Sequence, residues 1–255
     1  MVINKKILQG KEKYEGKVFR TVNYGDLLIL EYRKSNEILV EFLNTKTKVI
    51  ASINSIMEGK VKDRFAPSVF GVGVVGNDAV VKDGRVLKEY VRWQAMLERC
   101  YNENNRDKRQ AYEGCTVSEN FKYFPYFKEW YNAQVGHNIK GWDLDKDILS
   151  NDGKVYSEDT CVFIPFEINR CISDKAFSNK NDLPSGVKEH GGDGLKYYSA
   201  SIYEFGESRY IGNYDTILEA KNAYYAERIK HIHKLAEKWK DQIDPRAYEA
   251  LSRLS

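Results

Sequence analysis

Three aspartates, Asp143, Asp145 and Asp147, alternate along the segment WDLDKDIL, and Asn169 follows near the start of an expected helix. In an extended strand, alternate side chains lie on one face, so the three carboxylates would share a surface. Oxygen ligands of this kind could hold a hard divalent cation. The pattern is also typical of a strand with solvated acids on one face, and Asn169 could equally be a local hydrogen bonder. Both interpretations stay open.

A second group of side chains has the chemistry of a structural zinc site. Cys100, Cys115 and Cys161 could converge with His137, because thiolate and imidazole are the preferred ligands of zinc. The closely spaced cysteine pairs that mark such sites are absent. The spacing favours reduced thiols packed in the core over a zinc site.

The composition indicates a soluble globular protein. Of 255 residues, 42% are hydrophobic and 30% are charged, and no apolar run is long enough for a membrane span. The N-terminal sequence lacks the apolar segment of a secretory signal. We therefore expect a cytoplasmic protein with no membrane partner.

The net charge of +3 is compatible with nucleic-acid binding without requiring it. Residues 1–62 hold 12 Lys and Arg against 7 Asp and Glu, a balance of +5, whereas residues 101–180 balance at −2 and residues 181–240 at zero. A polyanion would meet the first segment most favourably. The 18 tyrosines suit base stacking, and they suit ordinary core packing equally well.

Short alternating runs predict four or five strands between residues 16 and 55, which would form a small antiparallel barrel or curled sheet. Residues 63–84 are rich in glycine and are expected to form a connector between domains, with a short hairpin at 72–81. Apolar spacing predicts helices over 85–101 and 120–134, the second kinked near Pro125.

The second half of the chain predicts two further units. A strand at 143–149, a second short strand at Val155-Tyr156, the segment CVFIP and a helix beginning at Phe166 give a β-β-α order. Three strands between residues 186 and 214 and a long amphipathic helix to about residue 240 would form a sheet with one helix across it.

Two segments resemble known families. The pattern WQAMLERCYNE, YEGCTVSENF and LDKDILSNDGKVYSEDTCVFIPFEIN over residues 93–170 is similar to phage and intron HNH homing endonucleases. The pattern GVKEH, YYSASI and RYIGNYDTILEAKNAYYAE is similar to an AP2-type DNA-binding domain. The two resemblances cover a little over half of the chain, and their order also occurs in phage-encoded proteins.

The HNH resemblance implies a metal-dependent DNA cleavage site. Asp145 matches the acid and Asn169 the helix residue that together hold Mg²⁺ or Mn²⁺, while Lys146 occupies the place of the family's general-base histidine. A protonated lysine cannot accept a proton from water. The protein would then be a binding-only scaffold, or would cleave slowly with Asp147, His137 or a metal-bound water as base, unless the β-β-α register is misread.

The AP2 resemblance implies that the three-stranded sheet enters a groove of DNA. Tyr198, Ala200 and Ile202 match structural positions of the family. Side chains of opposite parity and at the turn are the expected DNA contacts: Lys188, Lys196, Ser199, Ser201, Tyr203 and Arg209. Few arginines are present for reading guanine, so base readout would be weak.

We therefore expect an α+β protein with three domains and one connector. These are a small β-barrel-like domain at 1–62, a connector at 63–84, an HNH-like domain at 85–180 and an AP2-like domain with a C-terminal helix at 181–255. The expected function is binding of double-stranded DNA, with metal-dependent nicking or cleavage as an added activity. The alternatives are a non-catalytic DNA-binding protein and a regulatory protein-interaction module with a protein partner.

Overall fold

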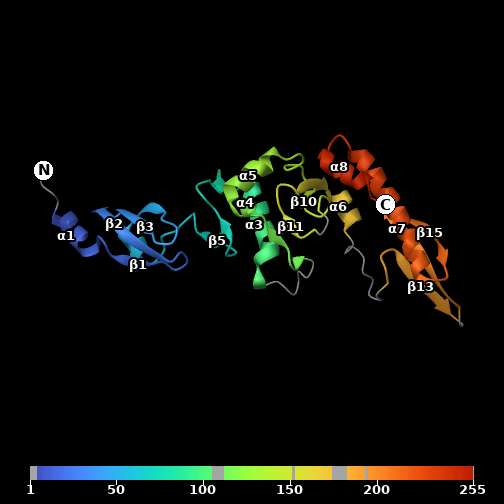
Figure 1. Ribbon diagram of the computed structural model, residues 1–255, viewed down its shortest axis with the longest axis horizontal. Helices are drawn as coiled ribbons and strands as arrows, with labels where there is room; N and C mark the ends of the chain where they lie inside the picture. The colour runs from blue at the N-terminus through green and yellow to red at the C-terminus, as the bar shows by residue number, and fades with distance from the viewer. Residues whose placement is uncertain (1–4, 105–111, 151–152, 174–182, 193–194, 255) are drawn as a thin grey trace. The chain divides into compact units, whose positions relative to one another are not determined.

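A computed structural model describes residues 5–104, 112–150, 153–173, 183–192 and 195–254, and it has the expected α+β class. The chain divides into two compact units, Met1–Trp130 and Tyr131–Ser255, which are described separately (Figure 1). This division falls within the expected 85–180 domain. No helix among the described residues has the length and apolar character to cross a membrane.

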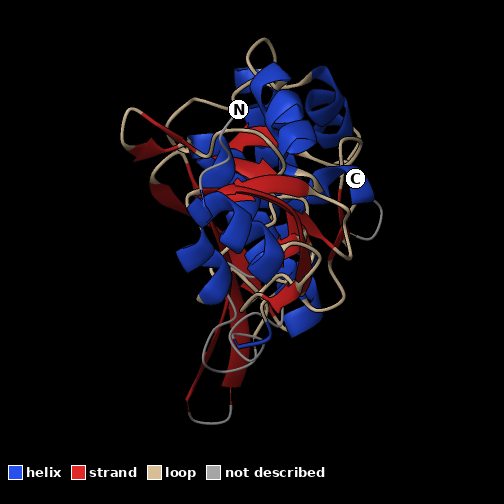
Figure 2. Ribbon diagram, turned by 90° about the vertical axis from the view of Figure 1, so that its left-hand side faces the viewer, coloured by secondary structure: helices blue, strands red, loops and turns tan. Residues whose placement is uncertain are grey.

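The first unit begins with a four-stranded antiparallel meander. Its strands are β1 (Val18–Arg20), β2 (Asp26–Lys34), β3 (Glu37–Phe42) and β4 (Lys48–Ala51), hydrogen-bonded in that order. The predicted strands are confirmed, but the predicted barrel is wrong. Strands β1 and β4 stay at opposite edges of the sheet, which is therefore not closed into a barrel; Figure 2 draws the strands in red. A closed barrel would require β1 and β4 to pair with each other, and in this sheet each of them pairs on one side only.

Two helices that the sequence did not announce accompany this sheet. In α1 (Lys5–Tyr14), Gly10 is buried because the ring of Tyr32 occupies the space where a Cβ would lie. Tyr14 stacks on Tyr32 with ring centroids 5.8 Å apart. The short helix α2 (Ile53–Met57) is capped by a serine hydroxyl, which satisfies one of its free N–H groups. The core of this domain is aliphatic and aromatic: Leu27, Ile29, Tyr32, Ile38, Val40, Phe42, Ile56 and Val61.

The connector contains two hairpins in place of the one predicted at 72–81, and that prediction is wrong. Strand β5 (Pro67–Val69) pairs with β6 (Gly73–Val74), and β7 (Val81–Lys82) pairs with β8 (Arg85–Val86). Both tight turns need left-handed backbone, at Phe70-Gly71 and at Asp83-Gly84. Gly71 and Gly84 therefore lie in the turns of two separate hairpins.

Both predicted helices of the middle region are present with shifted ends. Helix α3 (Lys88–Tyr101) begins after β8, and the second splits into α4 (Glu119–Lys122) and α5 (Phe124–Ala133), because Pro125 starts a new helical turn. The two-residue strand β9 (Thr116–Val117) lies between α3 and α4. The indole N–H of Trp93 donates to the carbonyl of Phe121 at 2.7 Å.

The second unit starts with a two-stranded antiparallel ribbon, β10 (Trp142–Asp145) and β12 (Val162–Pro165), with the short strand β11 (Val155–Tyr156) between them in sequence. Strand β12 is buried along its whole length and leads directly into α6 (Phe166–Ile172). The predicted strand at 143–149 is too long, because β10 ends at Asp145.

A three-stranded antiparallel meander follows: β13 (Val187–Gly192), β14 (Leu195–Glu204) and β15 (Glu207–Tyr214). Helix α7 (Ile217–Trp239) begins at a capping box formed by Thr216 and Glu219. Its first turns pack on one face of the sheet, and the shared core contains Val187, Tyr198, Ala200, Ile202, Ala220 and Tyr224. The predicted inward positions of β14 are confirmed.

Helix α7 continues beyond the sheet and joins it to the rest of the unit (Figure 1). Its later turns pack against α6 and against α8 (Pro245–Ser252). Trp142 of β10 meets Trp239 edge to face, with ring centroids 5.8 Å apart. The guanidinium Nε of Arg228 donates to the carbonyl of Cys171 at 2.8 Å. One helix thus supports both regions that the resemblances single out.

Candidate nucleic-acid interface

Asp145 ends strand β10 and is buried, with only 6% of its surface exposed. Its Oδ1 accepts hydrogen bonds from the backbone N–H groups of Asp147 and Ile148, each at 2.9 Å. Burial raises the pKa of this carboxyl above its usual value, against the lowering effect of those hydrogen bonds. The geometry is that of a carboxylate that closes a turn.

Lys146 is buried beside it and is held by an ion pair. Its Nζ donates to Oδ1 of Asp147 at 2.6 Å and lies 5.5 Å from the centroid of the Tyr156 ring. An ammonium that donates to a carboxylate has no lone pair with which to accept a proton. At the position where the family has its histidine, this side chain is placed to hold the turn.

Asn169 lies on α6, and its amide Nδ2 faces a different aspartate from the one expected. It donates to Oδ2 of Asp143 at 3.4 Å, a long hydrogen bond. Asp143 and Asp145 both lie on β10, but Asp147 lies in the turn beyond the strand end. The expected row of three carboxylates on one strand is therefore wrong.

These contacts decide whether the residues present fit the Mg²⁺ or Mn²⁺ implied by the resemblance. One oxygen of Asp145 is already bonded to two N–H groups, Asn169 pairs with Asp143, and the ammonium of Lys146 lies next to the carboxylates. A divalent cation needs converging oxygen ligands, and a nearby ammonium repels it. The set does not fit a metal ion as arranged, and the described residues contain no cluster of three or more His, Cys, Asp or Glu side chains suited to one.

His137, expected as an alternative base, lies at the end of the turn that follows α5. Its Nδ1 is 2.7 Å from the carbonyl of Gln134, and its ring meets Tyr131 edge to face. Both contacts fix the imidazole within the turn. No described contact joins it to Asp145 or to Asn169.

The four cysteines form no disulfide, and two of them are buried and two partly buried. Burial raises the pKa of Cys161 to about 12 and that of Cys171 to about 11. Zinc binds the thiolate, which such environments disfavour. The positions of these thiols are those of core side chains.

Beside the aspartates lies a pocket of about 330 Å³. Asp145 and Asp147 form its acidic side, and its other walls include apolar side chains of α7, among them Ile229 and Ile232. Ser173, Tyr225 and Arg228 also line this pocket, so its lining is mixed in polarity and charge.

The three-stranded sheet presents a different surface. Its face away from α7 is defined by the strand register, because residues directly opposite each other in neighbouring strands share a face. Ser199 lies opposite Lys188 and Asn213, Ser201 opposite Tyr210, and Tyr203 opposite Ser208. We call this surface the open face: Lys188, His190, Tyr197, Ser199, Ser201, Tyr203, Ser208, Tyr210 and Asn213.

The open face has no acidic side chain. The three strands contain the carboxylates Glu189, Glu204 and Glu207, and all three lie in register with the residues that face α7. Lys188 is exposed on the open face. A polyanion would therefore meet hydroxyls, aromatic rings and a cation with no carboxylate among them.

Four of the six expected contacts, Lys188, Ser199, Ser201 and Tyr203, lie on this open face. Lys196 is exposed near the β13–β14 turn, where its Nζ pairs with Glu189 at 2.9 Å.

The sixth, Arg209, is misplaced by the sequence reading. It lies opposite Ile202 on the side facing α7, with Nε 2.7 Å from Glu204 and Nη2 2.6 Å from Glu227. A register shift between Ala200 and Ser201 is the reason, because parity counted without it assigns β15 side chains to the wrong face. The same shift places Tyr210 on the open face, opposite Ser201.

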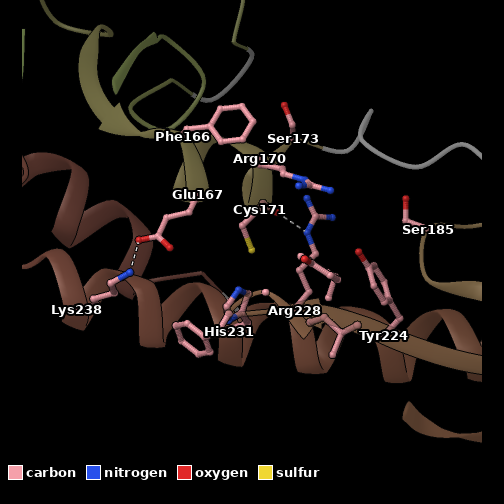
Figure 3. A pocket seen from close by; sticks show the side chains of 14 residues that line it. Phe166, Glu167, Arg170, Cys171, Ser173, Ser185, Tyr224, Arg228, His231 and Lys238 are labelled. Carbon is pink, nitrogen blue, oxygen red and sulfur yellow. Dashed lines mark hydrogen bonds and ion pairs between the residues drawn. The ribbon is translucent and has the colours of Figure 1, made fainter. Parts of the chain in front are cut away.

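A cavity of about 340 Å³ separates α6 from the β14–β15 turn and α7 (Figure 3). In the close-up, Lys238 reaches Glu167 and the Arg228 guanidinium points towards α6. Two buried atoms beside α7, Nδ1 of His231 and Oε2 of Glu204, lie 3.7 Å apart and make no hydrogen bond among the described residues. Burial lowers the pKa of His231, so the neutral imidazole is favoured.

Comparisons of the chain with family models, curated proteins and solved structures find no match. The family resemblance therefore rests on the sequence motifs alone.

Proposed function

We propose that this chain binds double-stranded DNA through the open face of β13–β15 and does not cleave it. The observation that supports the proposal most strongly is the segregation of charge on this sheet: its carboxylates lie towards α7, and its open face has none. The motif resemblance to phage proteins with an HNH-like core and an AP2-like module points the same way. The cytoplasm of a bacterial host would be the site of action.

The side chains of the open face suit backbone contacts better than base reading. Lys188 can neutralise a phosphate, and serine and tyrosine hydroxyls can donate to phosphate oxygens. Arg209 is engaged by Glu204 and Glu227 and does not lie on this face. Bidentate arginine is the usual reader of guanine, so we expect low sequence preference.

The contacts around β10 support the part of the proposal that excludes cleavage. Asp145 closes a turn, Asn169 bonds Asp143, and Lys146 is paired with Asp147. In a working site of the HNH kind, the ion would stabilise the leaving oxygen while a neutral base took a proton from water. Here Asn169 is paired with Asp143, Asp145 accepts from two backbone N–H groups, and Lys146, at the matched base position, donates to Asp147.

The experiment combines a gel shift with a nicking assay on supercoiled plasmid in Mg²⁺, in Mn²⁺ and in EDTA. We expect a duplex shift in all three buffers and no nicked or linear product. Lys188→Ala should weaken binding several-fold and reduce the slope of log Kd against log salt by about 1. Lys221→Ala on the exposed side of α7 is the matched control and should leave both unchanged.

Two outcomes would contradict the proposal. Metal-dependent nicking that disappears in Asp145→Asn would establish a nuclease. If the gel shift is absent or does not depend on salt, a protein partner becomes the better interpretation of the β13–β15 sheet.

A further inference from the structure

We propose that the open face of β13–β15 stacks on unpaired bases, so that the preferred ligand is DNA with an unpaired segment. This inference rests on the proposed function, because it names the form of DNA that the same surface favours. It is drawn from the tyrosine side chains of the face and from their spacing.

The open face exposes more aromatic surface than folding requires. Tyr210 is 60% exposed, Tyr203 is 55% exposed and Tyr197 is 36% exposed. Contact with water stabilises an exposed aromatic ring little, whereas the flat face of a nucleic-acid base can stack on it. Successive bases stacked on such rings are a common basis for binding single strands without sequence preference.

The tyrosines form two platforms along the sheet. Tyr203 lies opposite Ser208 and Tyr210 lies opposite Ser201, so Tyr203 and Tyr210 are diagonal neighbours about 7–8 Å apart. Tyr197 lies six residues before Tyr203 on the same strand, about 20 Å away. Between the platforms are the hydroxyls of Ser199 and Ser201, which can bond phosphates or base edges.

Neighbouring groups support the rings. His190 stacks on Tyr197 with centroids 5.0 Å apart and planes inclined by 13°, and its Nε2 lies 2.7 Å from the hydroxyl of Ser199. At the other platform, the guanidinium of Arg170 from α6 lies 5.6 Å from the centroid of the Tyr203 ring. A ring held in place loses less freedom when it binds, and a nearby cation favours the phosphate that follows the stacked base.

Paired DNA cannot use these platforms fully. In a duplex the flat faces of the bases are covered by their neighbours, and only edges and phosphates reach the grooves. The open face offers broad aromatic surface, and the arginine of its strands, Arg209, is directed to α7. A protein partner is less favoured, because aliphatic side chains are nearly absent from this face, with Leu195 at the start of β14 as the exception.

The test compares three fluorescent probes at one salt concentration: an oligo(dT) of about twelve nucleotides, a fully paired duplex of the same length and a duplex with a central unpaired thymine segment. We expect the full chain to bind the two probes with unpaired bases about tenfold more tightly than the duplex. Tyr210→Ala should remove most of that difference, with an effect of about twofold or less on the duplex. Tyr210→Phe keeps the ring and should keep the preference.

Leu218→Ala, which removes a 63% exposed side chain from α7, is the control and should change nothing. Circular dichroism and a melting curve check that each variant is folded. Equal or tighter binding of the duplex, or no effect of Tyr210→Ala, would overturn this inference and leave the proposed function standing. Failure to bind any probe would overturn both.

Discussion

Strand β10 and the open face of β13–β15 are the two regions to which the motif resemblances assign function, and they use their polar side chains in opposite ways. On and after β10, carboxylates, an amide and an ammonium bond to one another or to the backbone. On the open face, Lys188, Tyr203 and Tyr210 are exposed, and the acids of the sheet lie on its other side.

The difference teaches that residue types alone do not identify a working site. A buried polar group must be satisfied internally, because leaving it without a partner costs a few kcal/mol. Once Asp145 is satisfied by the turn it closes, one of its oxygens is committed to structure. An exposed face has no such requirement and can keep its groups for a ligand.

The largest expected effect comes from placing acids on the open face. Ser201→Glu combined with Ser208→Glu introduces two carboxylates where none exists, and repulsion from phosphates should weaken DNA binding about 100-fold. Leu218→Glu with Asn222→Glu adds the same charge to the exposed side of α7 and should have a much smaller effect. Fluorescence anisotropy measures both, and equal losses in the two variants would show that net charge governs binding, with no role for the face.

The next effect concerns the stability of the turn after β10. Asp145→Ala removes the acceptor of two backbone N–H groups and should lower the free energy of unfolding by about 2–4 kcal/mol. Asp145→Asn keeps an acceptor oxygen and should not show this loss. Urea denaturation distinguishes the two variants, and equal stability of wild type, Ala and Asn variants would contradict a structural role.

The pH dependence of Asp145 has a defined sign. Because its pKa is raised in the folded state, folding is favoured by the protonated form, and this contribution is lost as the pH rises above the ordinary carboxyl pKa. Asp145→Asn should therefore gain stability relative to the wild type as the pH rises above the ordinary carboxyl pKa. A loss of stability in Asp145→Asn over this pH range would mean that the folded state favours the ionised carboxylate.

A smaller effect is expected at Arg209, which the sequence placed on the open face and the structure places against α7. Arg209→Gln leaves Glu204 and Glu227 without their guanidinium partner, so the melting temperature should fall. DNA affinity measured well below that temperature should change by no more than about twofold. A large loss of DNA affinity with an unchanged melting temperature would mean that Arg209 contacts the DNA.

The smallest effect is expected at His231. Its imidazole lies beside Glu204, which also lies near Lys234, and the ring of Phe205 meets the imidazole edge to face. Its pKa is lowered by burial, so stability should fall as the pH drops below about 6.5. Thermal melts between about pH 7.5 and pH 5.5 should show this slope in the wild type and a weaker one in His231→Gln. Equal slopes would place the titration elsewhere.

The sequence predicted the regular parts of the fold because periodicity is local. Alternation gave the strands of both sheets, and the inward positions Tyr198, Ala200 and Ile202 are confirmed. The helices over 85–101 and 120–134 are present, the second divided at Pro125. Helix α1 was missed because a glycine in its middle is a poor helix former and is retained to accommodate Tyr32.

The candidate site residues were likewise predictable only where a local pattern decides their position. From types and spacing alone, the sequence determined that an acidic strand precedes a helix with Asn169, and that a polar, tyrosine-rich sheet follows. Only the tertiary structure decided that Asn169 faces Asp143, that Asp145 closes a turn, and that a register shift exchanges Arg209 and Tyr210 between faces. The physical reason is that hydrogen-bond partners and sheet register depend on contacts between distant segments, which local patterns do not specify.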